Sequence, residues 1–352
     1  STLKISPYSE SEKMTNQNMQ AFTFKRYGKS PDVGLAATGR PAALKANEIL
    51  VQVHAAALNP IDNMILTGMF KPVLHFQLPA TIGSDLAGVV IEVGSGVTRF
   101  KPGDAIFASI FDTGTGAVAE YAVVAESAAA LKPTNLDFVQ AASIPMVGLT
   151  SWQALKEQAG IQPGQKVFIP AGSGGIGTFA IQLAKYFGAK VATTTSSKNL
   201  ALVKSLGADQ VIDYTKQDFD KVLLGYDMVL GTIKGDVIEK SIGILKPGSK
   251  IVSLVGPLDK AFAQARRLNF VLKFVFGLMS RKIIAQAKKR QVSYSFLFVR
   301  PDGNQLSDIS KLLEAEQVKP VIDKVFPFEQ AKDALAYLAQ GRAKGKVVIK
   351  II

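Results

Sequence analysis

Two hydrophobic patterns follow one another along the chain. Up to about residue 135, short apolar runs of β character alternate with glycine-containing turns, and Pro102-Gly103-Asp104 is typical of such a turn. This part is expected to be a twisted, barrel-like β domain. The runs that indicate it lie at 48–58, 85–97, 104–111 and 119–125.

After residue 136, strands and helices alternate. The run 166–171 indicates a buried strand, and the apolar residues after it have helical spacing: Ile176, Ala180, Leu183, Ala184 and Phe187. Alternation of this kind predicts a parallel sheet with right-handed crossovers. The further strands are expected at 190–195, 210–214, 225–232 and 250–256, and the further helices at 200–208 and 236–245. A last helix over 329–340 and a strand over 345–352 are expected to rejoin the β domain.

The composition is that of an ordinary globular protein, and it excludes several kinds of catalytic and metal-binding chemistry. The chain has 352 residues, of which 47% are apolar and 20% charged, enough for two domains. It has no cysteine, which excludes disulfides, thiolate metal sites and cysteine nucleophiles. Two histidines, His54 and His75, are too few for a histidine-based zinc site without help from carboxylates.

Much of the net charge of +13 lies in one segment. Residues 260–290 hold nine Lys or Arg and no Asp or Glu. Within 257–295 the apolar residues have helical spacing, and we expect a helix that buries Leu268, Leu272 and Phe276; Val275 and Met279 belong to the same pattern. A helical insertion that covers the cleft or a subunit interface is the favoured interpretation. A surface for anionic lipid and a surface for an acidic substrate or partner are the alternatives.

The sequence does not favour nucleic acid or a membrane-spanning segment. It has no basic strand interleaved with aromatic residues, as single-strand readers have. The most apolar window, 268–279, is shorter than the roughly 20 residues of a span. Residues 1–18 are expected to form a flexible tail, and no secretory signal is seen in residues 1–30. We expect a cytoplasmic protein.

The strongest chemical signal is a glycine-rich turn between a strand and a helix. Gly172, Gly174 and Gly177 have the spacing of the dinucleotide fingerprint. A pyrophosphate must approach bare backbone N–H groups at a helix N-terminus, where the helix dipole favours negative charge. Gly177 would also allow the helix to pack closely on the sheet. This turn predicts a dinucleotide site.

Residues at the end of the second strand favour NADPH over NADH. NAD sites place a carboxylate there for the ribose 2′-hydroxyl. Here the chain reads Thr-Thr-Thr-Ser-Ser-Lys over 193–198, and there is no Asp or Glu between Glu157 and Asp209. Hydroxyl groups and Lys198 suit a 2′-phosphate. Alternatively, Ser196, Ser197 and Lys198 only begin the next helix.

Several motifs in one order resemble a known family. From residue 19 to the C-terminus the chain resembles the zinc-independent quinone oxidoreductase and enone reductase branch of the medium-chain dehydrogenase/reductase superfamily. The motifs are AALNPID (56–62), GSDLAGVVIEVG (83–94), AEYAVV (119–124), ASIPMVGLTSWQAL (142–155), AGSGGIG (171–177), LGAD (206–209), LKPGSKIV (245–252) and GKVVI (345–349).

The resemblance implies an α/β protein with a GroES-like β-barrel domain over 19–137 and 300–352. A Rossmann domain with a doubly wound parallel sheet is implied over 138–299, with the basic helical insertion at 257–295. A homodimer is an option. Asn59 would face the nicotinamide, and Thr150 would contact the same end of the cofactor. Gly174, Gly175, Ile176 and Gly177 would hold the pyrophosphate, and Ser196, Lys198 and Tyr214 would hold the 2′-phosphate. The backbone near Phe296 and Phe298 would bind the carboxamide, and Lys346 would approach the cofactor from the last segment. Ser173 and Ser197 are the further residues expected to bind the cofactor.

Departures from the zinc-containing relatives narrow the chemistry. Zinc alcohol dehydrogenases have Cys where this chain has Asn59, and His-Glu where it has Ser84-Asp85. No metal is therefore expected, and alcohol oxidation is disfavoured. Many quinone oxidoreductases have a tyrosine where this chain has Met64, so the proton donor is unassigned.

The sequence thus predicts an NADPH-dependent enzyme that transfers hydride to a small-molecule substrate, an α,β-unsaturated carbonyl compound or a quinone. The alternative is an NADPH-binding interaction or sensing module that uses the basic 257–295 surface. Asn59 and Thr150 favour the enzyme.

Overall fold

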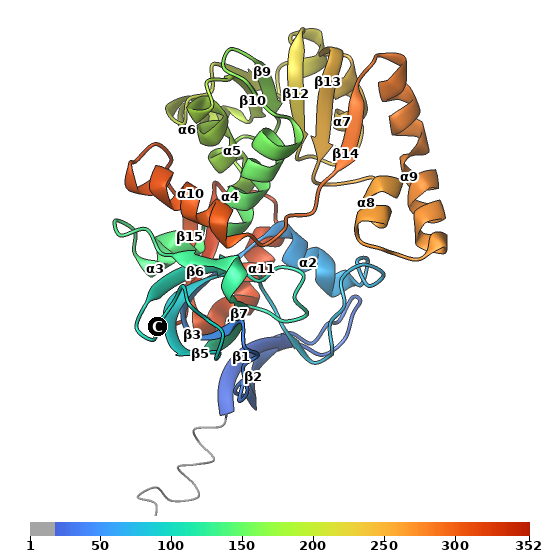
Figure 1. The fold of residues 1–352 in the computed structure, drawn as a ribbon. Coiled ribbons are helices and arrows are strands. Elements are labelled where there is room, and N and C mark those ends of the chain that lie inside the picture. The colour runs from blue at the N-terminus through green and yellow to red at the C-terminus, as the bar shows by residue number, and fades with distance from the viewer. Residues whose placement is uncertain (1–17) are drawn as a thin grey trace, which may run out of the picture.

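The computed structural model describes residues 18–352, which form a β-rich lower part and a layered α/β upper part (Figure 1). Apart from Asn18, the tail expected at 1–18 lies outside the described residues. The expected α/β fold class is confirmed.

A seven-stranded sheet forms the framework of the β-rich part. Its strands follow the order β15-β16-β3-β5-β6-β8, and β7 also pairs with β3. All its pairs are antiparallel except β15 with β16. Glycine and turn residues separate the apolar runs into distinct strands, and a glycine within a strand, such as Gly88 in β5, allows the sheet to curve. The strands are β3 (Glu48–Leu58), β5 (Asp85–Val93), β6 (Ala105–Ser109), β7 (Tyr121–Ala125), β8 (Ala129–Leu131), β15 (Ile322–Pro327) and β16 (Lys346–Lys350).

A small antiparallel sheet lies beside this framework, in the order β2-β1-β4. Its strands are β1 (Asn18–Phe24), β2 (Gly34–Gly39) and β4 (Ala80–Thr81). Phe22 and Phe24 of β1 are buried in the same core as the larger sheet.

The upper part contains a six-stranded parallel sheet in the order β11-β10-β9-β12-β13-β14. Numbered from its first strand this is the order 3-2-1-4-5-6, that of doubly wound dinucleotide-binding sheets. The expected strand over 190–195 is β10 with the same bounds. The strands are β9 (Lys166–Ile169), β10 (Lys190–Thr195), β11 (Gln210–Asp213), β12 (Tyr226–Gly231), β13 (Leu245–Ser253) and β14 (Ser293–Phe296).

Helices cover both faces of the parallel sheet and join it to the β-rich part. One continuous apolar core extends from the barrel to one face of the parallel sheet, and a second core lies on the other face. The helices are α2 (Pro60–Thr67), α3 (Phe138–Ala142), α4 (Pro145–Trp152), α5 (Gly175–Tyr186), α6 (Leu200–Ser205), α7 (Val237–Ile242), α8 (Lys260–Ala265), α9 (Phe270–Lys289), α10 (Gly303–Glu314) and α11 (Ala331–Ala339).

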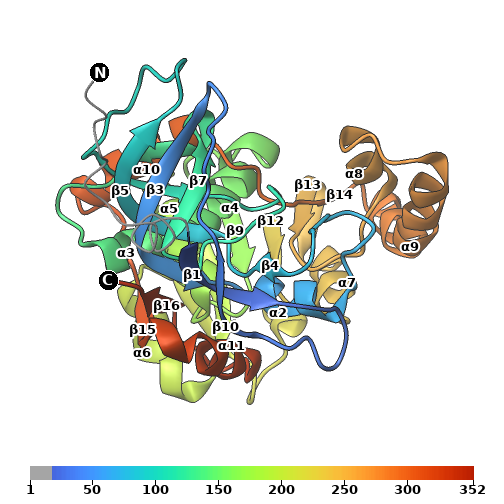
Figure 2. The same ribbon diagram turned by 90° about the horizontal axis from the view of Figure 1, so that it is seen from below.

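The segment 257–295 is helical, but its expected burial is only partly right. It forms two helices, α8 and α9, which project sideways beyond β14 (Figures 1 and 2). Phe276 is buried as expected, whereas Leu268 and Leu272 are only half-buried. Val275 and Met279 are exposed. Because α9 packs through one narrow side only, much of its apolar surface faces outward.

Candidate active site

A cavity of about 620 Å³ lies between the two parts of the molecule, and its lining is mostly apolar. The β-rich part contributes Asn59, Met64 and Phe70, and the α/β part contributes Thr150 and the glycine turn. Of the site residues expected from the sequence, the cavity brings together Asn59, Thr150, Gly174, Gly175, Ile176, Phe296, Phe298 and Lys346.

The glycine turn runs from β9 into α5 and is closely packed. A Cβ atom on Gly172 would lie 2.1 Å from the Thr193 hydroxyl oxygen, and one on Gly177 would lie 2.6 Å from the Ala171 carbonyl oxygen. Larger residues would therefore displace the turn from the sheet. Gly177 lies inside this packing and is not part of the cavity lining.

The start of α5 leaves room for a phosphate. Gly174 is the N-cap of α5, and no side chain caps the helix there. The first-turn N–H groups have no acceptor within the helix. A Cβ on Gly174 would have no neighbour closer than 3.6 Å, so the space beside it is open. A dinucleotide pyrophosphate fits this cradle, where the helix dipole would favour its charge.

Asn59, the N-cap of α2, is held by groups on both sides of its amide. Its oxygen accepts a hydrogen bond from the Lys346 ammonium, which also donates to the Leu58 carbonyl at 2.9 Å. Its nitrogen donates to Asp85 at 3.0 Å. These partners fix the orientation of the amide, and Asn59 is only 3% exposed.

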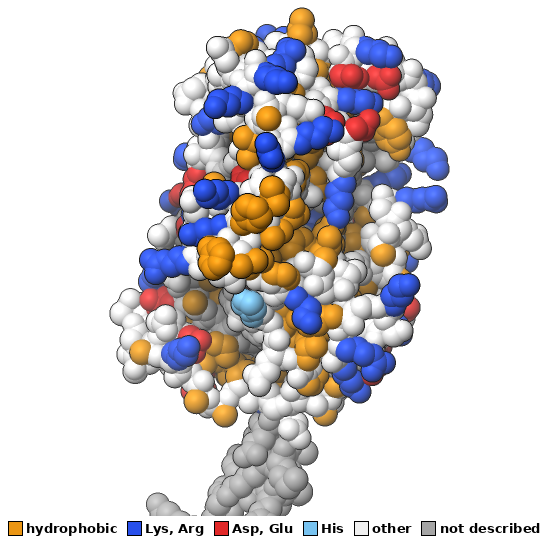
Figure 3. Space-filling model, turned by 90° about the vertical axis from the view of Figure 1, so that its right-hand side faces the viewer, with side chains coloured by type: hydrophobic (Ala, Val, Ile, Leu, Met, Phe, Trp, Pro, Cys, Tyr) orange, Lys and Arg blue, Asp and Glu red, His pale blue; other side chains and the backbone are white. Residues whose placement is uncertain are grey.

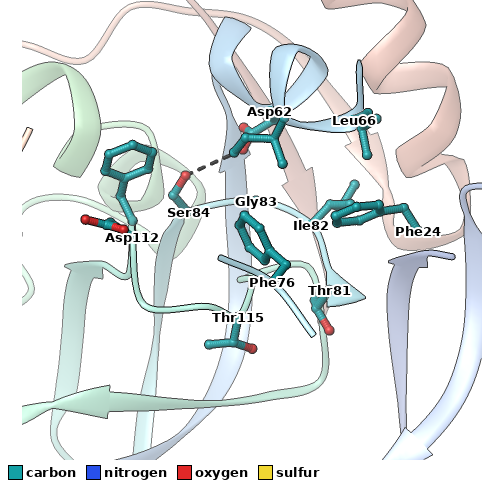
Figure 4. Close-up of a pocket in the computed structure, with 12 residues that line it drawn as sticks. Phe24, Asp62, Leu66, Phe76, Thr81, Ile82, Gly83, Ser84, Asp112 and Thr115 are labelled. Atoms are coloured by element: carbon teal, nitrogen blue, oxygen red, sulfur yellow. Dashed lines mark hydrogen bonds between the residues drawn. The ribbon is translucent and has the colours of Figure 1, made fainter. Parts of the chain in front are cut away.

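Two buried carboxyl groups complete this cluster. Asp85 accepts a hydrogen bond from the Met146 backbone N–H at 2.9 Å, and Asp62 accepts one from the Asn59 backbone N–H at 2.7 Å. Ser84 points toward Asp62, with Phe24, Leu66 and Phe76 nearby (Figure 4).

The surroundings shift the pKa values of these groups. Burial raises the pKa of Asp62 to about 7 and the pKa of Asp85 to about 6, and the nearby Lys346 ammonium opposes both shifts. Burial also lowers the pKa of Lys346, against the attraction of the two carboxyl groups. Sequence reasoning did not place Asp62 in the site, although it lies three residues after Asn59 in the same motif, at the position of a capping box.

Aromatic residues also line the cavity. Phe296 ends β14, and its ring centroid lies 5.0 Å from that of Phe298. Phe298 also packs against Phe70 of the β-rich part, with 5.3 Å between centroids. Thr150 lies on α4 and is buried. Met64 lines the cavity at the position where many quinone oxidoreductases have a tyrosine.

The residues expected to hold the 2′-phosphate lie outside this cavity, at the ends of β10 and β11. Lys198 is exposed and Tyr214 is 62% exposed, so both are accessible to a ligand. Ser196 is the N-cap of a short 3-10 helix, Ser197–Asn199. The Ser197 hydroxyl donates to the Asp213 carboxylate, a contact that sequence reasoning missed because it crosses between adjacent strands.

Asn199 supports a ligand at this end of the sheet. Its side-chain nitrogen lies 3.3 Å from the Ser173 hydroxyl, which is itself 3.3 Å from the Thr195 hydroxyl. Its side-chain oxygen is buried and has no donor among the described residues. A ribose hydroxyl or an adenine amino group would supply such a donor.

The described residues contain no recognisable metal centre and no membrane-spanning helix. Within 18–352, no group of three or more His, Asp or Glu side chains is arranged to hold a metal ion. Over the same range, no helix is both long and apolar enough to cross a bilayer.

The parallel sheet, its glycine turn and the apolar cavity define a dinucleotide-binding α/β protein with a β-barrel partner domain. Two family models match: an alcohol dehydrogenase GroES-like domain over residues 45–134 and a zinc-binding dehydrogenase domain over 206–349. The barrel is thus GroES-like, as expected.

Known proteins that are similar to this chain over nearly its whole length indicate the same family. The mitochondrial NAD(P)H oxidoreductase RTN4IP1 of Danio rerio is 34% identical over 95% of this chain and 92% of its own. The 2-methylene-furan-3-one reductase of Solanum lycopersicum is 36% identical over 94% and 79%. The quinone oxidoreductase structure from Coxiella burnetii has a TM-score of 0.81 and 32% identity, and covers 95% of this chain and 100% of its own. The chain belongs to the zinc-independent quinone oxidoreductase and enone reductase branch of the medium-chain dehydrogenase/reductase superfamily.

Proposed function

We propose that the protein is a zinc-independent, NADPH-dependent oxidoreductase that reduces small α,β-unsaturated carbonyl compounds or quinones. The observation that supports this most strongly is that one cavity with mostly apolar walls is lined by the glycine turn, Asn59 and Lys346 together. The names of the relatives agree: one is an enone reductase and another a quinone oxidoreductase. They do not favour the sensing-module alternative.

The cofactor would extend from the outer ends of β10 and β11, past the glycine turn, into the cavity. Gly174, Gly175, Ile176 and Gly177, with Ser173, would bind the pyrophosphate. Thr150, Phe296 and Phe298 would surround the nicotinamide end. Ser196, Lys198 and Tyr214 would bind the 2′-phosphate; Ser197 could join them only by giving up its hydrogen bond to Asp213.

The chain would contribute position and electrostatics. When bound, the reduced cofactor supplies the hydride. Asn59 has a second amide hydrogen besides the one donated to Asp85, and Asn59 lines the cavity. We infer that this hydrogen stabilises the oxygen of the acceptor as negative charge develops there. Lys346, hydrogen-bonded to the amide oxygen, would make Asn59 a stronger donor.

The test is NADPH consumption with a panel of enones, enals, quinones, saturated ketones and alcohols, followed by product analysis. We expect turnover with conjugated acceptors and quinones only. Oxidation of alcohols, or turnover with saturated ketones alone, would contradict the proposal. Tight NADPH binding without turnover on any acceptor would favour the sensing module.

We also propose a division of the chain into two domains. Residues 19–137 and 300–352 would form the GroES-like domain, and residues 138–299 would form the Rossmann domain, since each of the two large sheets falls within one of these domains. A homodimer is a further proposal; β14 is the last strand of the parallel sheet, and a second copy could pair along it. The relative from Danio rerio is a mitochondrial protein, which does not favour the cytoplasmic location expected from the sequence.

A further inference from the structure

The outward face of α9 is apolar in its first half. Phe270, Phe274 and Leu278 are 81%, 66% and 53% exposed. They are four residues apart and therefore lie along one side of the helix. The opposite side holds the helix in place through Phe276, Ser280, Ile283 and Ala287. Bulky apolar side chains therefore face away from the protein.

The second half of the same face is basic. Phe270 and Lys288 are 18 residues apart, which is five whole turns, so they point in the same direction. Arg281 and Lys289 are exposed on that side as well. Among the described residues, only Arg266 and Lys282 of the nine cations in 260–290 form ion pairs, with Asp112 at 2.6 Å and Glu239 at 3.4 Å.

The shape of the molecule leaves this face accessible. In Figures 1 and 2, α8 and α9 stand at the outer edge, beyond the parallel sheet. On the side of the molecule that they occupy, hydrophobic side chains gather across the middle of the surface with Lys and Arg around them (Figure 3). With its 20 residues, α9 is roughly 30 Å long, enough for an extended contact.

We propose that the outward face of α9 docks on a bilayer that contains anionic lipid. An amphipathic helix with bulky apolar residues and adjacent cations can lie in the interface, with its apolar side chains among the acyl chains and its cations at the headgroups. Charge decides between this occupant and a second copy of the chain. Two copies that meet through α9 would place cations against cations, because 260–290 has no acidic residue.

The cavity extends this proposal to the substrate, a step that depends on the proposed function. Phe276 and Met279 of α9 line the cavity, as do Pro257 and Leu258 just before α8. A docked α9 would therefore hold the apolar cavity next to the bilayer. The acceptors best placed to enter it are lipophilic quinones or long-chain enals dissolved in the membrane.

The docking test is sedimentation of the full chain with vesicles of phosphatidylcholine alone or with about 30 mol% phosphatidylglycerol. We expect binding only to the anionic vesicles, with release at high salt. The triple variant Phe270→Ser, Phe274→Ser, Leu278→Ser should lower binding about tenfold or more. The triple variant Arg281→Glu, Lys288→Glu, Lys289→Glu should abolish it.

A matched control carries the same change in net charge on other elements: Lys29→Glu, Lys204→Glu and Lys332→Glu, all at exposed positions. It should bind nearly as the unmodified protein does. The proposal is overturned if the unmodified protein stays in solution, if either α9 variant binds normally, or if the control loses binding equally. If the unmodified protein forms dimers and binds no vesicles, and the variant with the three Ser substitutions no longer forms dimers, then a second copy of the chain is the occupant of this face.

Turnover separates this proposal from the proposed function. With a water-soluble acceptor, all three variants should retain the activity of the unmodified protein. With an acceptor dissolved in anionic vesicles, only the two α9 variants should slow. If the protein binds vesicles but turns over no acceptor, the docking surface is supported and the proposed enzymatic function is contradicted. Equal rates of all variants on the membrane-dissolved acceptor would overturn the substrate step.

Discussion

The Lys346 ammonium donates a hydrogen bond to the side-chain amide oxygen of Asn59, a residue 287 positions earlier in the chain. Both side chains are almost fully buried, with Asp62 and Asp85 beside them. The Lys346 cation thus lies near two carboxyl groups and is hydrogen-bonded to Asn59, the residue expected to face the nicotinamide.

Removing this cation should destabilise the protein in a pH-dependent way. The substitution Lys346→Met leaves two buried carboxyl groups without a counter-charge, a loss of about 3 kcal/mol in similar buried pairs. Urea unfolding should show a larger loss at pH 8 than at pH 5, because protonation neutralises the carboxyl groups at the lower pH. The conservative Lys346→Arg serves as the control. The same loss at both pH values would show that Lys346 acts through packing alone.

The carboxyl groups themselves predict how stability varies with pH. Their pKa values of about 7 for Asp62 and about 6 for Asp85 lie above the usual 3.8, so the folded state binds protons more tightly than the unfolded state. The stability due to this protonation is complete below pH 3.8 and is lost as pH rises through 6 to 7. Asp62→Asn should flatten the fall in unfolding free energy over this window, and Asp333→Asn on the surface should not. If the unfolding free energy of Asp62→Asn falls as steeply over this window as that of the unmodified protein, the raised pKa of Asp62 is contradicted.

Cofactor selection should depend on Lys198. Its exposed ammonium, at the same end of the sheet as Ser196 and Tyr214, can pair with a 2′-phosphate but has no partner on NADH. Lys198→Ala should raise the NADPH KM by about tenfold, a typical loss for one charge-assisted bond, and leave the NADH KM nearly unchanged. Lys204→Ala on α6 is the matched control. Comparable efficiency of the unmodified protein with both cofactors would refute the preference.

Catalysis should not require a metal. The position where zinc relatives have cysteine holds Asn59, whose amide is already bonded to Lys346 and Asp85. Elemental analysis of active protein should find no stoichiometric zinc, and chelators should leave turnover unchanged. Activity that a chelator removes and added zinc restores would show that a metal takes part.

The glycine turn offers a pair of substitutions with different outcomes. Gly174→Ala places a methyl group in open space, no closer than 3.6 Å to any atom of a residue that is not its chain neighbour, so the fold should be unaffected. The methyl group lies where the pyrophosphate would approach, and NADPH affinity should fall by about tenfold or more. Gly177→Ala instead meets backbone atoms at 2.6 and 2.7 Å and should lower Tm. Gly174→Ala with normal NADPH affinity would place the pyrophosphate elsewhere.

Sequence periodicity predicted the architecture well, because each strand and helix has its own local pattern. β10 matches its predicted bounds, and the glycine turn is where the motif indicated. Contacts between distant segments were harder to foresee. The hydrogen bond from Ser197 to Asp213 depends on strand register, and the cluster around Lys346 depends on the return of the last strand. The spacing of apolar residues in α9 indicated a helix. It did not indicate which apolar side of that helix would pack against the rest of the protein.

The return of that last strand also limits how the molecule can move. Gly345, immediately before β16, donates its backbone N–H to the Ser173 carbonyl at 2.9 Å and forms a bridge with Gly174. The barrel is thus tethered to the dinucleotide turn at one edge of the cleft. This contact joins the last strand directly to the dinucleotide turn, so a displacement of the turn would be transmitted to Lys346 and, through its hydrogen bond, to Asn59.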